Sequence, residues 1–213
     1  MMNKYKNTKE VLVIFIPSLL VLALVAFCTV VINIPIDLMM RDLAAIAGIS
    51  PLSGILSSLG SFYWAASATV CIFSAVTLYQ FKSKKIFDFL LFSGILSSYL
   101  AFDDFFMFHE YIGPRFFYMK ETFIIIMIMI AVIIYLLKFG KLILTTDYKF
   151  FVLAIVFLSL SVALDVAEGR WINLGNWGSF YEDGFKWLGI TSWLSYFSYT
   201  SYHLFLNSLR EKI

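Results

Sequence analysis

Long apolar stretches divide this chain, and they constrain its fold more than any other feature. We predict membrane spans over residues 11–34, 52–79, 86–108, 123–139, 150–167 and 181–206. A helix needs about 20 mainly apolar residues to cross a bilayer. Hydrophobic residues make up 61% of the chain and charged residues 14%, whereas about a quarter of the residues in soluble domains are charged. The sequence therefore predicts an all-α, polytopic membrane protein, a six-transmembrane-helix bundle that forms a single transmembrane domain over residues 1–213.

The segment between the first two predicted spans is too short to cross a membrane. Residues 36–50 lie between Pro35 and Pro51, and Arg41 and Asp42 stand in the middle of otherwise apolar sequence. An amphipathic segment of this length is typical of a helix that lies in the membrane interface. We predict an interfacial helix over residues 36–50.

The basic residues predict the orientation of the bundle. With six spans, eleven of the 16 Lys and Arg residues fall on the side of the termini, at positions 4, 6, 9, 82, 84, 85, 138, 141, 149, 210 and 212. The other five, at positions 41, 115, 120, 170 and 186, fall on the opposite side. Because Lys and Arg accumulate in cytoplasmic loops, we expect a multi-pass protein with both termini in the cytoplasm.

Ionisable residues gather at the end of the third predicted span. Asp103, Asp104, His109 and Glu110 follow a long apolar run, and charges in such a setting are costly enough to indicate a functional site. On a continuous helix Asp103 and Glu110 would lie on one face, within roughly 20° of each other, while Asp104 and His109 would point elsewhere. The six-span topology brings further acids to the same layer, at the end of span five and the start of span six.

This layer supplies the candidate site residues. The candidate catalytic residues are Asp103, Asp104 and Asp165, and the candidate metal ligands are Asp103, His109, Glu110, Asp165, Glu168, Glu182 and Asp183. Many carboxylates in a partly dry site need protons or a cation to neutralise them. Oxygen-rich ligand sets suit Ca²⁺, Mg²⁺ or Mn²⁺, and Zn²⁺ or iron would require His109 as a ligand.

Some of these residues also have ordinary structural interpretations. Ser179 and Glu182 have the spacing of a helix capping box, and Glu182 and Lys186 have the spacing of a helical ion pair. His203 lies about 30 Å along its span from the acids, so we expect it to pack beside neighbouring tyrosines and to stay outside the site.

The function indicated by this layer is a metal-dependent intramembrane hydrolase of a lipid or amphiphile, with a divalent metal ion as cofactor. One alternative is a cation- or proton-coupled transporter or channel in which the acids bind the ion directly. Another is a non-catalytic subunit that docks through the apolar span 123–139, within a homo-oligomer or a larger membrane complex. The sequence has no P-loop or zinc-protease motif and no basic aromatic surface, so we expect membrane lipid as a partner and no nucleic acid.

Overall fold

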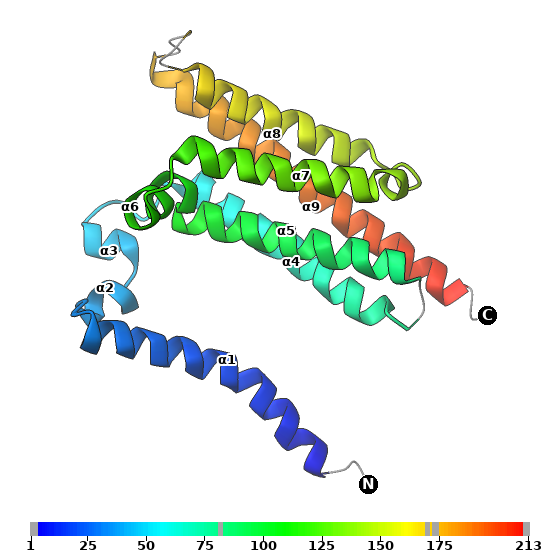
Figure 1. The fold of residues 1–213 in the computed structure, drawn as a ribbon, viewed down its shortest axis with the longest axis horizontal. Coiled ribbons are helices and arrows are strands. Elements are labelled where there is room, and N and C mark those ends of the chain that lie inside the picture. The colour runs from blue at the N-terminus through cyan, green and yellow to red at the C-terminus, as the bar shows by residue number, and fades with distance from the viewer. Residues whose placement is uncertain (1–3, 81–82, 169–170, 172–174, 211–213) are drawn as a thin grey trace. The chain divides into compact units, whose positions relative to one another are not determined.

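The structure is a computed structural model that describes residues 4–80, 83–168, 171 and 175–210. All regular elements in these ranges are helices (Figure 1). The chain forms two compact units, residues 1–53 and residues 54–213, which are described separately. Each unit is helical, which confirms the predicted fold class at this level.

The first unit contains one long and two short helices. Helix α1 is Lys4–Val31, α2 is Ile36–Met40 and α3 is Leu43–Ala47. The prediction of one interfacial helix over 36–50 is therefore wrong in detail. Arg41 has an extended backbone (φ −100°, ψ 156°), which ends α2, and Asp42 at φ −59°, ψ 137° begins α3.

The second unit is a bundle of long helices joined by short elements. Its elements are α4 (Ile55–Leu78), α5 (Lys84–Phe106), the π-helix η1 (Phe108–Ile112), α6 (Gly113–Phe117), α7 (Glu121–Ile143), α8 (Lys149–Ala167), the 3₁₀-helix η2 (Gly175–Trp177) and α9 (Gly178–Arg210). Helix α4 packs against α5 and α9, and α9 also packs against α8. Helix α9 therefore links α4 to α8 within the bundle.

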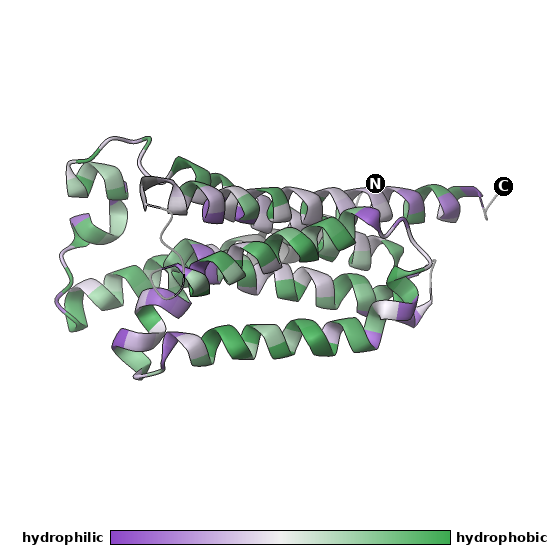
Figure 2. Cartoon of the chain, turned by 90° about the horizontal axis from the view of Figure 1, so that it is seen from above, coloured by the Kyte–Doolittle hydropathy of each residue, from purple (hydrophilic) through white to green (hydrophobic). Residues whose placement is uncertain are grey.

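Four helices, α4, α5, α7 and α8, are long and apolar enough to cross a membrane. Six spans are not confirmed, because α9 and the searched part of α1 do not meet this standard. Helix α9 is long, but its polar residues recur along its length, as the pale and purple segments before the C-terminus show (Figure 2). Several of them, including Thr200 and Ser201, are buried against protein.

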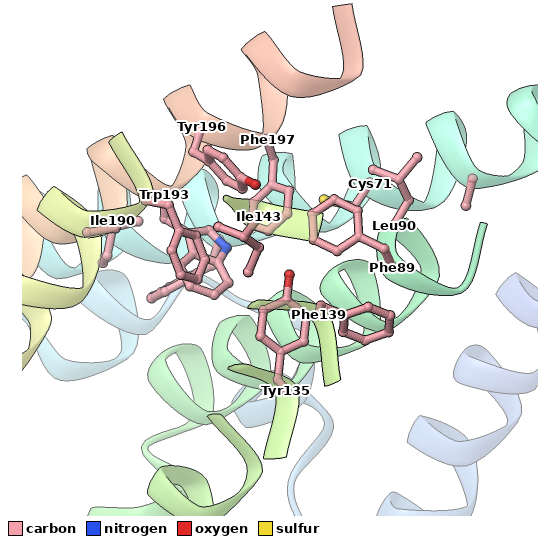
Figure 3. Close-up of a cluster of buried hydrophobic side chains, with 14 of the residues drawn as sticks. Cys71, Phe89, Leu90, Tyr135, Phe139, Ile143, Ile190, Trp193, Tyr196 and Phe197 are labelled. Carbon is pink, nitrogen blue, oxygen red and sulfur yellow. The ribbon is translucent and has the colours of Figure 1, made fainter. Parts of the chain in front are cut away.

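The core of the second unit is rich in aromatic side chains. Phe89, Tyr135, Trp193, Tyr196 and Phe197 are all buried and converge from α5, α7 and α9 (Figure 3). The ring of Phe89 joins the helices, with its centroid 6.3 Å from that of Tyr135 and 6.0 Å from that of Phe197. Such contacts add to the area that each ring buries.

Small residues and hydroxyl groups bring the helices close together. A Cβ on Gly94 of α5 would lie 2.5 Å from Ile72 Cγ1 and 3.3 Å from the Ala68 carbonyl oxygen of α4. The buried Trp193 indole N–H donates to Ser97 Oγ over 2.9 Å, which joins α9 to α5. Close approach at small residues and interhelical hydrogen bonds are the usual means by which helices associate in lipid. These contacts fix α4 and α9 against α5, the helix whose end carries the candidate site.

Candidate functional site

The candidate site begins where α5 ends. Met107 has a left-handed backbone (φ 51°), and its N–H donates to the Asp103 carbonyl oxygen. This conformation is uncommon for a residue with a side chain, and it persists where the surrounding structure holds it. The chain then turns into η1. The condition of a continuous helix is therefore not met, and Asp103 and Glu110 do not share a helical face.

The turn folds His109 back onto Asp103. The His109 backbone N–H donates to Asp103 Oδ1 over 3.0 Å, and ring atom Nδ1 lies 2.7 Å from Asp103 Oδ2. Only 7% of the Asp103 side chain is exposed, against 20% for His109. Both carboxylate oxygens of a nearly buried acid are thus satisfied by one residue, which fixes the position and the orientation of the imidazole.

The environment of His109 favours its protonated form. The hydrogen bond with Asp103 raises the pKa of His109 above its ordinary value of 6.5, and the charges of Asp103 and Glu110 act in the same direction. Burial and the positive charge of Lys186 oppose this rise in the pKa of His109. The second ring nitrogen, Nε2, lies 3.5 Å from Glu110 Oε1, whose side chain is half exposed. Nε2 is therefore the ring atom that faces Glu110, on the more exposed side of the site.

Asp104 points away from His109 and into the bundle. Its Oδ1 forms an ion pair with the Lys186 ammonium group of α9, and its Oδ2 accepts a hydrogen bond from Ser61 Oγ of α4 over 3.3 Å. The exposed fractions are 7% for the Asp104 side chain and 30% for that of Lys186. A Cβ on Gly60 of α4 would lie 3.1 Å from Ile190 Cδ1 of α9, so this glycine lets the two helices approach closely beside Asp104. Neighbouring acids on α5 therefore have separate partners.

A small crevice lies beside this ion pair, between α4 and α9. It is lined by Leu56, Ser57, Gly60, Asp104, Asp183, Lys186, Trp187 and Ile190. The Trp187 ring also packs against Tyr63, with centroids 4.7 Å apart. The crevice therefore has a charged end and an aromatic wall.

The remaining predicted acids gather where α8 ends and α9 begins. Glu182 interacts electrostatically with three nearby acids, Asp165, Asp183 and Glu168, and with Lys186. The Glu168 carboxylate packs directly against Gly178, the first residue of α9, so any Cβ there would overlap it. A carboxylate at this position is stabilised by the helix dipole.

Lys186 lies near both sets of acids, those at the end of α5 and those where α8 ends and α9 begins. Its positive charge interacts with both His109 and Glu182. Among the residues of the predicted polar layer, Asp103 is paired with His109, and Asp104 with Lys186. Among the residues that the structure describes, no group of three or more His, Cys, Asp and Glu side chains is arranged to hold a metal ion. The reason is local: Asp103 is satisfied by His109, and Asp104 by Lys186 and Ser61.

Comparison with known proteins places the chain in a family. Residues 13–200 match the family described as Domain of unknown function (DUF8692). The chain belongs to this family. The matched range contains every candidate site residue named above. No curated protein and no solved structure matches the chain.

Sequence reasoning missed Lys186 and Ser61 as site residues. Lys186 was expected to pair with Glu182 along one helix, whereas it pairs with Asp104 across the bundle. The available signal was its position, because Lys186 is the only Lys or Arg between residues 181 and 206. His203, in contrast, packs on Tyr199 with centroids 4.3 Å apart, as expected.

Proposed function

We propose that the protein is an integral membrane enzyme that uses Asp103 and His109 as an acid–base pair and hydrolyses a lipid or another amphiphile. The observation that carries this proposal is the orientation of the imidazole, which binds Asp103 through Nδ1 and turns Nε2 toward the half-exposed Glu110 carboxylate, 3.5 Å away. A buried carboxylate on Nδ1 fixes the tautomer of a catalytic histidine and stabilises its charged form. A positioned general base of this kind contributes about 10²–10⁴-fold to a rate.

The reaction would proceed by attack of water on an ester or amide carbonyl. Above the pKa of His109, where the imidazole is neutral, its Nε2 accepts a proton from the water as the water oxygen bonds to the carbonyl carbon. The imidazolium, stabilised by Asp103, then returns this proton to the leaving oxygen or nitrogen as its bond to carbon breaks. The products are a carboxylic acid and an alcohol or amine.

The described residues fit a resident metal ion only in part. Two candidate ligands, Nε2 of His109 and the Glu110 carboxylate, lie 3.5 Å from each other. A catalytic zinc site needs three protein ligands, one more than this pair supplies.

The experiment compares the two histidines of the chain. The purified protein in lipid nanodiscs of total lipid extract would be assayed by mass spectrometry for released fatty acids. We expect His109→Gln to lower the rate by about 100-fold or more, and His203→Gln, the matched control, to keep it. Release at the level of empty nanodiscs by the unaltered protein, or full activity in His109→Gln, would contradict the proposal.

A second candidate function is proton-coupled transport. It is supported by the buried ion pair of Asp104 and Lys186, because ionisable pairs inside membrane bundles often form proton relays. In liposomes containing a pH-sensitive dye, Asp104→Asn would then abolish a proton flux that Asp88→Asn, a change on the same helix, would leave intact. Absence of flux in the unaltered protein under any gradient would exclude this candidate.

We also propose six crossings with both termini in the cytoplasm. Helix α9 has 33 residues and is therefore about 50 Å long, which exceeds the thickness of a bilayer core of about 30 Å. The excess of Lys and Arg on the side of the termini supports this orientation. Reporter fusions at both ends test it, since a fluorescent cytoplasmic reporter is expected at each.

A further inference from the structure

An exposed aromatic surface surrounds the end of α5. It consists of Phe102, Phe105 and Phe106 of α5, Phe116 and Phe117 of α6, and Tyr118, which follows α6; we refer to it as the α5–α6 aromatic surface. The exposed fraction ranges from 45% for Phe102 to 92% for Tyr118. Apolar surface of this size facing water is rare in soluble proteins and indicates a membrane or a partner.

This surface is physically continuous with the acid–base pair. Phe108, the residue before His109, has its ring centroid 5.9 Å from that of Phe102 and 6.1 Å from that of Phe117. The turn that carries His109 is therefore packed between the two halves of the surface. A molecule seated on these rings would lie beside the imidazole.

The backbone and the charges of this segment fit the boundary between lipid and water. Met107 and Tyr118, both with positive φ (51° and 54°), bound the segment that carries η1 and α6. Arg115 is exposed within this segment, and Lys120 is exposed just after it. Aromatic rings and basic side chains together are typical of the membrane interface, where rings sit at headgroup depth and Lys or Arg meets phosphate. Helix α5 is one of the four candidate spans, so its end is expected at this depth.

We propose that the α5–α6 aromatic surface lies in the bilayer interface and seats the apolar part of a lipid whose head reaches Asp103 and His109. The site thus takes an acyl-chain lipid directly from the membrane, without passage through water. This part of the inference rests on the proposed function. The membrane contact of the surface does not, and it can be measured alone.

The test uses nitroxide spin labels to measure depth in the membrane. In a Cys28→Ser/Cys71→Ala background, single changes Phe105→Cys and Phe116→Cys are labelled in phosphatidylcholine nanodiscs. Collision with oxygen, which partitions into lipid, is compared with collision with a water-soluble nickel chelate. Ile130→Cys, on the exposed apolar face of α7, and Asp147→Cys, in the loop before α8, are the lipid and water controls.

We expect the chelate access of the labels at Phe105 and Phe116 to lie between those of the Ile130 and Asp147 labels, with oxygen collisions exceeding those of the chelate. Chelate access equal to that at Asp147 would overturn the proposal that the surface contacts lipid.

A kinetic comparison tests the lipid-seating part. Phe116→Ser/Phe117→Ser should raise KM for a long-chain phosphatidylcholine about tenfold and leave hydrolysis of a short-chain soluble ester unchanged. Equal effects on both substrates would overturn seating on these rings. Inactivity of the unaltered protein on both substrates would instead refute the proposed function and leave the spin-label result standing.

Discussion

The ion pair between Asp104 and Lys186 allows the sharpest prediction about stability. Its acid is 7% exposed and its ammonium group belongs to a side chain that is 30% exposed. Removing one partner of a buried pair costs about 3–5 kcal/mol, because the remaining charge is left without compensation. Since Lys186 is partly exposed, we expect Lys186→Met to lower the free energy of unfolding by about 3 kcal/mol, at the lower end of that range.

A double-mutant cycle separates this pairing from other effects. Asp104→Asn alone should cost about 1–2 kcal/mol, because Lys186 can turn toward water while the amide keeps its hydrogen bond with Ser61. In the double variant no charge remains unpaired, so its cost should be well below the sum, with a coupling energy of about 1.5–3 kcal/mol. Unfolding in mixed micelles at increasing SDS measures all four proteins. Additive costs would show that the pair does not stabilise the bundle and would refute this reasoning.

Further predictions concern packing, hydrogen bonding and pH. Gly94→Ala should lower the free energy of unfolding by about 1–3 kcal/mol, because its Cβ would meet Ile72 and the backbone of α4. Gly140→Ala, whose Cβ would have nothing within 4 Å, should not lower it. Equal melting temperatures of these two variants would contradict this prediction. Ser97→Ala should cost about 1 kcal/mol by leaving a buried indole N–H without its acceptor, as measured by the same SDS unfolding. The raised pKa of His109 means that its pairing with Asp103 stabilises the fold fully below the ordinary pKa of 6.5, and that this stabilisation fades as pH rises through the folded-state pKa. The melting temperature of the unaltered protein minus that of His109→Gln should therefore be largest near pH 6 and shrink toward pH 9, and a constant difference would contradict the ion pair.

The helices of the second unit follow closely from the sequence. Apolar length predicted four of them to within a few residues, including 86–108 against Lys84–Phe106 and 150–167 against Lys149–Ala167. Hydropathy is a good guide here because lipid requires an unbroken apolar helix. It is a poorer guide for α9, because buried polar residues such as Thr200 and Ser201 lower the hydropathy of a helix that packs against protein.

The site shows a different limit. The sequence placed Asp103, Asp104 and His109 at one end of the bundle, since they lie together in the chain. It did not predict their partners, because these depend on a left-handed turn at Met107 and on the Lys186 side chain of α9 reaching Asp104. Helical periodicity assumes that the helix continues. The interruption at Met107 therefore places Asp103 and Glu110 on different elements, and it brings His109 into contact with Asp103.

The central claim, that Asp103 holds and charges His109 through Nδ1, is tested most directly by ¹⁵N NMR of the protein labelled on histidine. Two histidines give two sets of ring signals, and His203→Gln assigns them. We predict that His109 keeps a proton on Nδ1 throughout, titrates at Nε2 above pH 6.5, and returns toward the ordinary histidine pKa in Asp103→Asn. A His109 titration that is unchanged by Asp103→Asn would contradict the account.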